Sequence, residues 1–576
     1  MITRWLAYFL VLLALTVSGA ACKGGGGGGD VFIEVVQTAP EDGSNAVPVE
    51  VRIGFQIDED IDETTLTDDN FFVTDAQGTR VQGALSIGDE PSIAVLTPSE
   101  PLSVITTYTA TITTALRSTG GATLEEEYDW TFTTLDSAWG ESEWLEEVSL
   151  GISAEPQVVV DAQSNALAVW EYMEATGTFI WANRYTRVDL WGEPETIDDG
   201  AGSANNPRLA TDDAGNGFVV YEQTGGGAIV NIWTNRYTVD QGWGTAELLQ
   251  NGEVTTARSP SVAADPAGNA IATWMQEDQD TGRELVWAIR YEPATGWGTA
   301  EPIDTMPAPT LRVGERTSVR MDDDGNAIAV WARPSVTMTG GRSEVLWANR
   351  YTPGSGWGTA EIIKPDTETR AQAERLSVGP NGDTFVVWIQ NDPARLCQIS
   401  PTVERPCEDI WAVRFSGSAW GPPERIDDYD DGNKEGPDVA VDGSGVAHAV
   451  WSQSDPDFQN IYAIQYTPGS EWGTPELIEP PNPDPNEDAD AATPRVAVNA
   501  AGNAFVVWRQ TWQDWASIWS NRLDPGTGWM TAELIEDIER SAKGPRIAVD
   551  DKRHAHAVWL HSRDAGIDWV RTNRFE

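Results

Sequence analysis

The sequence predicts an all-β protein in two parts, a β-sandwich followed by a β-propeller. Two observations lead to this fold class. Apolar and polar residues alternate in short runs that Gly, Pro, Asp and Asn interrupt, which is the pattern of strands joined by turns. From about residue 136 onward a unit of roughly fifty residues recurs, which is typical of a repeat architecture. Helical repeats do not fit, because the apolar runs alternate with period two.

The first thirty residues, MITRWLAYFLVLLALTVSGAACKGGGGGGD, predict export. Their apolar run of about thirteen residues is too short for a bilayer core that needs about twenty. Small residues before Cys22 and glycines after it resemble a bacterial lipoprotein signal. The resemblance implies a signal peptide over residues 1–21, lipidation of Cys22, and a glycine-rich tether over residues 22–30.

The lipoprotein resemblance departs from the usual pattern at one position. Gly19 stands where leucine is common, so cleavage after Ala20 or Ala21 and secretion of the protein is the alternative. Lys23, rather than Asp, is compatible with an outer-membrane anchor. We therefore expect the cell envelope as the location, with the membrane as a partner through the lipid, and leave the periplasmic or surface side open.

Residues 31–134 form the predicted sandwich. VEVRIGFQI, NFFVTD and YTATITTAL read as strands separated by turn residues. The opening TAPEDGSNAVPVEVRIGF, the middle NFFVTDAQGTRVQG, the stretch LTPSEPLSVITTYTATI and the closing YDWTFTT resemble the SbsA-type bacterial Ig-like domain of cell-surface proteins. The resemblance implies a spacer or adhesion module without a catalytic set.

Residues 136–576 repeat three signatures in fixed order. They are a strand-turn-strand such as SVAADPAGNAIATW (261–274), a short strand such as LWANRY (346–351), and a strand such as GWGTAEI (356–362). An aromatic residue ends each first signature, at Trp170, Tyr221, Trp274, Trp331, Trp388, Trp451, Trp508 and Trp559. These spacings, with about four strands a unit, predict a β-propeller of eight four-stranded blades.

The two ends of the repeat predict how the ring closes. The last copy stops before its third signature, whereas an unpaired SAWGESEWLEE (137–147) precedes the first copy. Pairing of 137–147 with 571–576 would complete the eighth blade and leave no open sheet edge.

The second and third signatures together carry a recurring trio, represented by Arg350, Trp357 and Glu361. If the trio is exposed, each of its eight copies could bind a sugar. The alternative is a structural ion pair and stacking contact across the outer hairpin. We favour the structural interpretation, because the trio persists where the loops differ. The D-x-x-G-N turns, such as Asp265 to Asn269, are likewise interpreted as hairpin chemistry.

Charge and cysteines set further bounds. The chain has 90 acidic and 37 basic residues and a formal charge of -53, so nucleic acid is not an expected partner. Cys397 and Cys407 predict a local disulfide that staples one loop. An acidic loop at 427–436 offers weak calcium ligands, Asp427, Asp428, Asp430 and Asp431, although a solvated loop is the favoured interpretation and no cofactor is expected.

Catalysis finds little support in the sequence. Among the four histidines, His554 and His556 could share a metal, but a third ligand is not evident. A sialidase-like centre would need clustered arginines with an acid and a tyrosine, whereas the recurring arginines lie on outer strands. The prediction is a monomeric, non-enzymatic surface module that presents its variable loops to a glycan or protein. The alternative is a propeller-type glycan-processing enzyme, a glycosidase or lyase, which convergence of three or more Asp, Glu, Tyr or Arg side chains at the centre would favour.

Overall fold

The chain divides into two compact units, Met1–Ser137 and Ala138–Glu576. The computed structural model describes residues 32–576 except 50, 100–101, 105, 147–150, 225–228, 251–254, 280, 305–315, 337–341, 365–370, 401–402, 418, 428–431, 455–457, 481–489, 513–514, 537–539 and 564–566. Within these residues all regular structure is β except the 3₁₀ turn η1 (Glu63–Thr65), which confirms the all-β prediction. None of the described helical residues form a segment long and apolar enough to span a bilayer. The predicted signal, Cys22 and tether lie outside the described residues.

The smaller unit is a sandwich of two four-stranded sheets. One sheet has the order β1 (Val35–Ala39), β3 (Ile53–Ile57), β6 (Ile93–Pro98), β5 (Gly83–Ile87), and the other β2 (Ser44–Val47), β8 (Tyr128–Thr134), β7 (Thr107–Ile112), β4 (Phe71–Thr74). The aromatic core joins both sheets, because Phe55 packs edge-on against Phe71 at 4.9 Å and Phe71 stacks on Trp130 at 6.0 Å. The alternating runs of the sequence thus bury one face of each sheet, as predicted.

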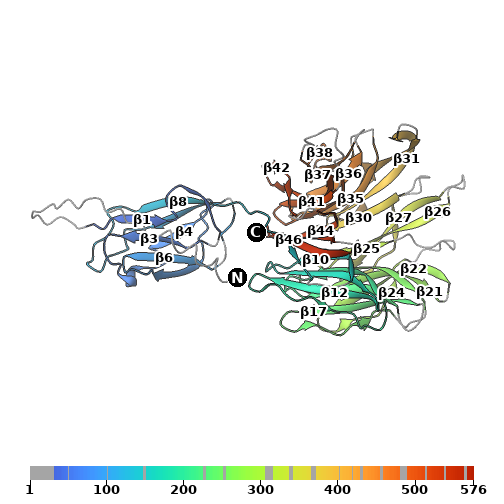
Figure 1. Ribbon diagram of the computed structural model, residues 1–576, viewed down its shortest axis with the longest axis horizontal. Coiled ribbons are helices and arrows are strands. Elements are labelled where there is room, and N and C mark those ends of the chain that lie inside the picture. The colour runs from blue at the N-terminus through green and yellow to red at the C-terminus, as the bar shows by residue number, and fades with distance from the viewer. Residues whose placement is uncertain are drawn as a thin grey trace, which may run out of the picture. The chain divides into compact units, whose positions relative to one another are not determined.

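The larger unit contains eight antiparallel sheets among its described residues, and they share one plan. Three long strands follow in chain order, and a short outer strand pairs with the third (Figure 1). The first four sheets are β10 (Ile152–Val160), β11 (Ala166–Glu174), β12 (Gly177–Thr186), β13 (Leu190–Trp191) and β14 (Glu195–Thr196); β15 (Ala204–Thr211), β16 (Gly217–Thr224), β17 (Val230–Thr238), β18 (Gly242–Trp243) and β19 (Glu247–Leu248); β20 (Ala257–Ala264), β21 (Ala270–Asp278), β22 (Arg283–Glu292), β23 (Gly296–Trp297) and β24 (Glu301–Pro302); β25 (Thr317–Met321), β26 (Ala327–Val336), β27 (Arg342–Thr352), β28 (Gly356–Trp357) and β29 (Glu361–Lys364).

The other four sheets repeat this plan. They are β30 (Ala371–Val378), β31 (Thr384–Ser400), β32 (Val403–Ser416), β33 (Ala419–Trp420) and β34 (Glu424–Arg425); β35 (Lys434–Val441), β36 (Ala447–Ser454), β37 (Gln459–Tyr466) and β38 (Glu476–Leu477); β39 (Ala491–Val498), β40 (Ala504–Trp512), β41 (Trp515–Asp524), β42 (Gly528–Trp529) and β43 (Glu533–Leu534); β44 (Ala542–Val549), β45 (Ala555–Ser562), β46 (Asp568–Phe575) and β9 (Glu143–Trp144).

The first strands of successive sheets pack against one another from β10 through to β44, and β44 packs against β10. The last sheet takes its outer strand from the beginning of the unit, since Glu143 pairs with Thr572 and Trp144 with Arg571. This is the pairing of 137–147 with 571–576 that the incomplete last repeat predicts. Figure 1 shows β46 and β44 beside β10.

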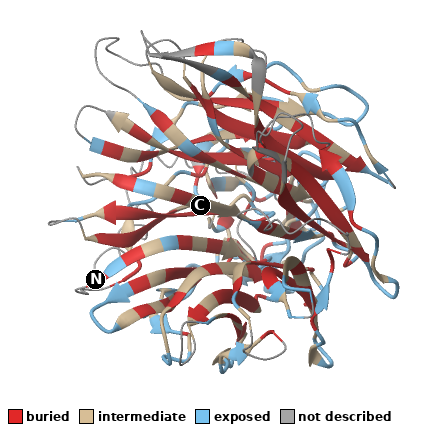
Figure 2. Cartoon of the chain, turned by 90° about the vertical axis from the view of Figure 1, so that its right-hand side faces the viewer, coloured by how far each residue is buried: buried red, intermediate tan, exposed pale blue. Residues whose placement is uncertain are grey.

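The core between sheets is built from the aromatic residues that end the first signature. All eight are fully buried, and each belongs to a cluster shared with a neighbouring sheet, as Trp274 does with Phe218 and Ile232. Buried positions run along the strands and exposed ones concentrate at their ends (Figure 2). A single sheet could not bury both faces alone, so the sheets stabilise one another.

The outer strand differs from the continuous hairpin that the sequence suggests. Trp357 pairs with Tyr351 and Glu361 with Ala348, but the segment between them leaves the ladder. The Asn349 side chain fills the gap, because its amide nitrogen donates to the carbonyls of Gly358 (3.2 Å) and of Ile303 in the preceding sheet (2.9 Å). Asn183, Asn235 and Asn573 make the same pair of contacts, and Asn521 makes the contact with the preceding sheet, to the carbonyl of Ile478.

Candidate functional site

Within the recurring trio, the arginine contacts the neighbouring sheet. The Arg350 guanidinium lies 5.1 Å from the ring centroid of Phe415 in the next sheet, while Glu361 is exposed and Trp357 packs edge-on against Tyr351. The predicted ion pair between Arg350 and Glu361 is absent among the described contacts. Its equivalent does form where β9 completes the last sheet, between Arg574 and Glu143 at 3.1 Å.

The arginine contact recurs between sheets with one informative gap. The pairs, at 5.0 to 5.3 Å, are Arg184–Tyr237, Arg236–Tyr291, Arg290–Tyr351, Arg350–Phe415, Arg414–Tyr466, Arg522–Phe575 and Arg574–Tyr185. Gln465 replaces the arginine in the sixth sheet, and Leu523 replaces the aromatic residue that would face it. Loss of both partners together indicates that the arginine serves the cation–π contact to the next sheet.

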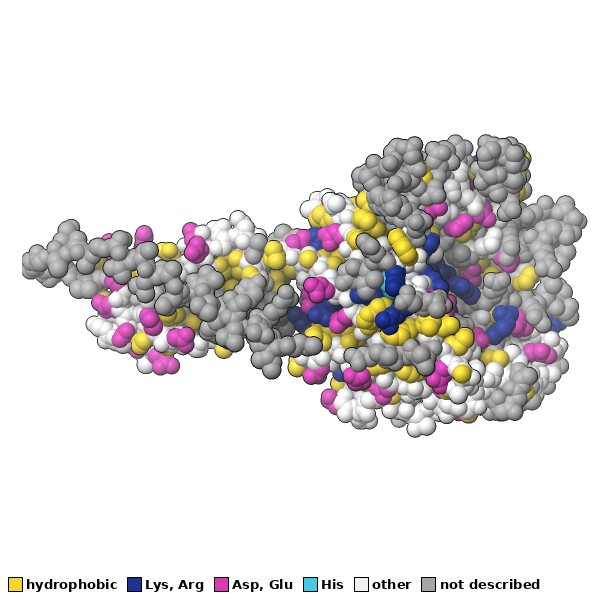
Figure 3. Space-filling view, viewed as in Figure 1, with side chains coloured by type: hydrophobic (Ala, Val, Ile, Leu, Met, Phe, Trp, Pro, Cys, Tyr) yellow, Lys and Arg dark blue, Asp and Glu magenta, His cyan; other side chains and the backbone are white. Residues whose placement is uncertain are grey.

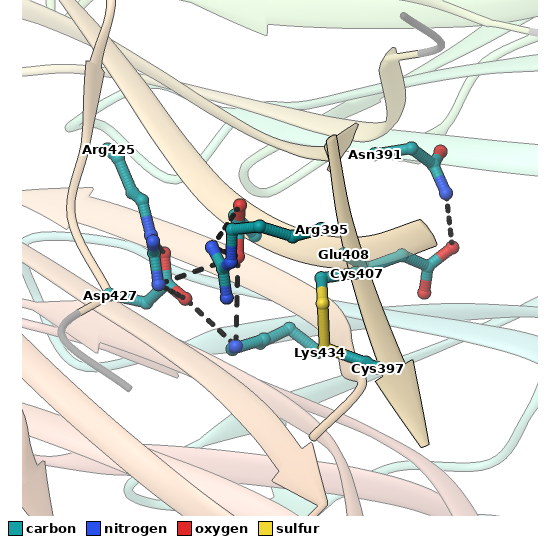
Figure 4. The surroundings of a disulfide bond; sticks show 9 residues. Asn391, Arg395, Cys397, Cys407, Glu408, Arg425, Asp427 and Lys434 are labelled. Carbon is teal, nitrogen blue, oxygen red and sulfur yellow. Dashed lines mark hydrogen bonds and ion pairs between the residues drawn. A yellow bond between two sulfur atoms is a disulfide. The ribbon is translucent and has the colours of Figure 1, made fainter. Parts of the chain in front are cut away.

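The predicted disulfide between Cys397 and Cys407 is present and joins β31 to β32. These strands form a long hairpin where the sequence suggests a loop. The charged residues near it are paired (Figure 4): the Asp427 carboxylate lies 2.8 Å from Arg425 Nε and 3.1 Å from the buried Lys434 Nζ. Asp427 is therefore engaged by cations of its own chain, whereas Asp428, Asp430 and Asp431 lie outside the described residues.

The histidines are used within the fold. His554 Nδ1 lies 2.9 Å from Asp550, and His556 is buried against the rings of Tyr185 and Trp191. In the part of the chain that the structure describes, no group of three or more His, Cys, Asp or Glu is arranged to hold a metal ion. The turn interpretation is supported, since Asp265 accepts the Asn269 N–H at 2.8 Å and Gly268 has φ +83°.

A cavity of about 870 Å³ lies where the eight first strands meet. Its walls come from β10, β15, β20, β25, β30, β35, β39 and β44, so every sheet contributes to it. Because side chains alternate along a strand, two positions of each first strand face the cavity.

Acidic side chains are scattered over the visible face of both units, whereas the basic ones of the larger unit occur in small groups (Figure 3).

A β-bulge aims the first of these positions into the cavity. In six sheets a residue with positive φ is followed by proline, and the bulge lies at that pair: Glu155-Pro156, Asn206-Pro207, Ser259-Pro260, Gly436-Pro437, Thr493-Pro494 and Gly544-Pro545. Proline has no N–H to leave unpaired in the interrupted ladder. Left-handed backbone costs about 1–2 kcal/mol at a non-glycine residue, and such strain concentrates at functional sites.

The residue that follows the bulge varies in charge from sheet to sheet, and Ser318 takes this position in β25, which pairs with β26 in continuous register. The eight positions are Gln157, Arg208, Ser261, Ser318, Arg375, Asp438, Arg495 and Arg546. The tier two residues further on is small except for one arginine: Val159, Ala210, Ala263, Arg320, Ser377, Ala440, Ala497 and Ala548. With Arg316, six arginines line the cavity, against the carboxylates Glu155, Glu171 and Asp438.

The guanidiniums crowd one another. Among the described residues, Arg208, Arg320, Arg375, Arg495 and Arg546 each donate to one main-chain carbonyl, that of the preceding residue, at 2.6 to 3.1 Å. Burial, together with neighbouring arginines, lowers the pKa of Arg375, Arg495 and Arg546 to about 10. They remain cationic at neutral pH, so the cavity is positive inside a strongly acidic chain.

The cavity carboxylates have unlike surroundings. The Glu155 carboxylate lies 3.9 Å from Arg546 and that of Asp438 lies 3.9 Å from Arg375, so each faces a guanidinium. Asp438 also accepts the Val496 N–H at 3.1 Å, and Glu171 accepts the Asn206 N–H at 2.6 Å. Burial raises the pKa of Glu171, the Asn206 hydrogen bond opposes the shift, and the nearby charge of Glu155 adds to it.

The sequence carries a signal for this cavity that the recurring signatures hide. Pro-Arg occurs at the start of the first signature, at Arg208, Arg495 and Arg546. The arginines of the outer strands recur in nearly every copy of the repeat and are conspicuous, whereas the cavity arginines occur in only some copies. Superposing the copies on their turn would have isolated one strand position where glutamine, arginine, serine and aspartate replace one another.

Three comparisons place these observations among known proteins. Residues 31–134 match the family model described as a bacterial Ig-like domain, which confirms that part of the prediction. A search of curated proteins finds no match. Solved structures that match include an ulvan lyase (10% identity, 76% of this chain and 93% of that chain, TM-score 0.39) and an α-L-arabinanase from Penicillium chrysogenum (11%, 76% and 98%, TM-score 0.37). A protein of unknown function from Dyadobacter fermentans also matches (8%, 77% and 99%, TM-score 0.38).

The prediction that the chain is not an enzyme is corrected. It relied on arginines being confined to outer strands, and the cavity instead gathers six at the centre with three carboxylates. The matching structures include a polysaccharide lyase, an arabinanase and an arabinofuranosidase. At these TM-scores they assign no particular reaction to this chain, so the reaction is argued from the cavity.

Proposed function

We propose that Ala138–Glu576 is a closed eight-bladed β-propeller that cleaves glycosidic bonds in its central cavity. The sequence of contacts from β10 to β44 and back supports closure, and β9 removes the remaining edge. The cavity volume suits a bound oligosaccharide, since ligand sites span about 300–1,000 Å³.

The observation that carries the proposal is the set of three cavity carboxylates in unlike environments. Glycosidic cleavage needs a protonated carboxyl that gives its proton to the leaving oxygen, and an ionised one on the other side of the bond. Glu171 has the surroundings of the proton donor. Glu155, beside Arg546, has those of the ionised partner.

The proposed hydrolysis needs only these two carboxyl groups and one water molecule. Glu171 donates its proton to the glycosidic oxygen as the bond to the anomeric carbon breaks. Water adds to that carbon, and Glu155 accepts the proton that the water loses. Exchange with solvent then restores both carboxyl groups.

Glu171→Gln tests the proposal, with Glu222→Gln as the matched control. Both glutamates accept the bulge N–H of the next sheet, at 2.6 Å from Asn206 and 2.7 Å from Ser259, but only Glu171 lines the cavity. Glutamine keeps the accepting oxygen and removes the acidic proton. We expect the full-length protein to release reducing ends from a panel of charged and neutral polysaccharides.

Glu171→Gln should slow that release at least about 100-fold, while Glu222→Gln stays within a few-fold of the unsubstituted protein. Cleavage should also fall as the pH rises through the pKa of Glu171. Unsaturated uronate products, detected by ultraviolet absorbance, would indicate elimination and contradict the hydrolytic step. Equal activity of the two variants would remove Glu171 from the reaction.

The location of the protein remains part of the proposal. We infer that Cys22 is lipidated and anchors the chain in the cell envelope, the Ig-like domain serving as a spacer. Incorporation of labelled palmitate that disappears in Cys22→Ala would support this. Release of the unsubstituted protein into the medium would favour the secreted alternative.

A further inference from the structure

Six arginines against three carboxylates leave the cavity with surplus positive charge among its described residues. The two ion pairs within it are long, at 3.9 Å, whereas an engaged charge-assisted hydrogen bond measures about 2.8 Å. The guanidinium forks are therefore held by main-chain carbonyls on one side and face open space on the other.

The arrangement is built into the backbone. Arg208, Arg495 and Arg546 each follow a bulge proline, and a carbonyl of that proline fixes each guanidinium at 2.6 to 3.0 Å. These arginines belong to three different sheets, and Arg375 to a fourth. Placing like charges together inside the fold is unfavourable for stability, so a ligand is the physical reason to expect for it.

We propose, on the basis of the glycan-cleaving function above, that the substrate is a glycan whose sugars carry carboxylate or sulfate groups, held by Arg208, Arg375, Arg495 and Arg546. The guanidinium fork matches the two oxygens of a carboxylate or sulfate. The arginines come from both sides of the ring, so they can hold anionic groups on more than one sugar.

Two residues further along the first strands the lining is mostly alanine, and Arg320 is the charged residue of that tier. The lining therefore offers guanidiniums at both tiers and little side-chain bulk at the second. A neutral sugar would leave the guanidinium donors without partners, and this loss is why the cavity should prefer an anionic glycan to a neutral one.

Two pairs of polysaccharides that differ only in charge test the inference: polygalacturonate against its methyl ester, and dextran sulfate against dextran. Binding to the full-length protein is measured by calorimetry. We expect the charged member of at least one pair to bind about tenfold or more tightly than the neutral one. Preference within the first pair identifies a carboxylate ligand, and within the second a sulfate ligand.

Arg495→Gln and Arg546→Gln should each weaken binding of the charged probe about tenfold, with Arg495→Lys intermediate because it keeps the charge and loses the fork. Arg522→Gln is the control, since Arg522 contacts Phe575 outside the cavity. Thermal unfolding verifies that each variant is folded. Equal affinity for charged and neutral probes, or charged binding that none of the cavity variants weakens, would overturn the inference.

The outcomes separate this inference from the proposed function. Cleavage of neutral glycans that depends on Glu171 would retain the enzyme and reject the anionic substrate. Arginine-dependent binding of charged probes without cleavage would retain the anionic ligand and reject the enzyme.

Discussion

The outermost and innermost strands of the larger unit are built from the same repeat but follow opposite rules. On the outer side the Arg, Asn and Trp positions recur, and their side chains fasten each sheet to the next, as Asn349 does with Ile303. On the inner side the backbone recurs, while the side chain at the cavity position is glutamine, arginine, serine or aspartate. Repetition therefore marks the residues that join the sheets, and variation within a recurring backbone marks those that face the cavity.

Removing the outer strand from one sheet should have the largest effect on stability. Replacing residues 138–146 with a Gly/Ser segment leaves the outer edge of β46 unpaired, while its pairing with β45 remains, and deletes the buried Leu145. We expect the free energy of unfolding to fall by more than about 4 kcal/mol in urea titrations followed by tryptophan fluorescence. Glu143→Gln, which removes only the ion pair with Arg574, should change it by less than about 1 kcal/mol. An unchanged midpoint on strand replacement would contradict closure by β9.

Asn349→Ala should cost more than Arg350→Gln, although the two residues are adjacent in the same motif. Asn349 is buried and donates to two carbonyls, which alanine would leave unpaired, so we expect a loss of about 2–3 kcal/mol. Arg350 makes a partly exposed cation–π contact worth about 0.5–1 kcal/mol. If both variants lose the same free energy of unfolding in denaturant titrations, the burial of an outer contact does not determine how much it contributes to stability.

His556 makes the seam between the first and last sheets sensitive to acid. Burial lowers the pKa of His556 to about 4 from an ordinary 6.5, so the unfolded chain binds the proton more readily than the folded one. The stabilisation is present above about pH 6.5 and is lost as the pH falls toward 4, by about 3 kcal/mol.

The matched control comes from the repeat, because Phe218, Phe385 and Phe505 occupy the same position in other sheets. His556→Phe should flatten the pH dependence of the unfolding free energy between pH 6.5 and 4. If the variant and the unsubstituted protein lose stability in parallel, another group governs the acid transition.

Substitution inside the cavity should have the smallest effect on stability. Arg375→Gln removes one charge from a group of like charges, so we expect the free energy of unfolding to change by less than about 1 kcal/mol or to rise. Its measurement beside Asn349→Ala tests whether the inner arginines serve the ligand and the outer motif serves the fold. A loss above about 2 kcal/mol would make Arg375 structural.

The sequence alone predicted the strands, the repeat, the disulfide and the pairing of the two ends, because each leaves a local pattern that recurs. It also predicted the turn chemistry at Asp265 and Gly268. The cavity left a weaker trace. Whether Arg208 faces the cavity depends on a bulge that shifts the alternation of its strand, and alternation counted along the chain does not reveal such a shift. The partner of Arg350 was misjudged for a related reason, since it lies in the next sheet and not across the hairpin.

The bulge before each cavity residue has a consequence for how such a site could change. In the sheets that have the bulge, it precedes the variable side chain, and the backbone has the same positive φ whether serine, arginine or aspartate follows. A single substitution at this position can therefore alter the charge pattern of the cavity while the backbone that carries it stays as it is.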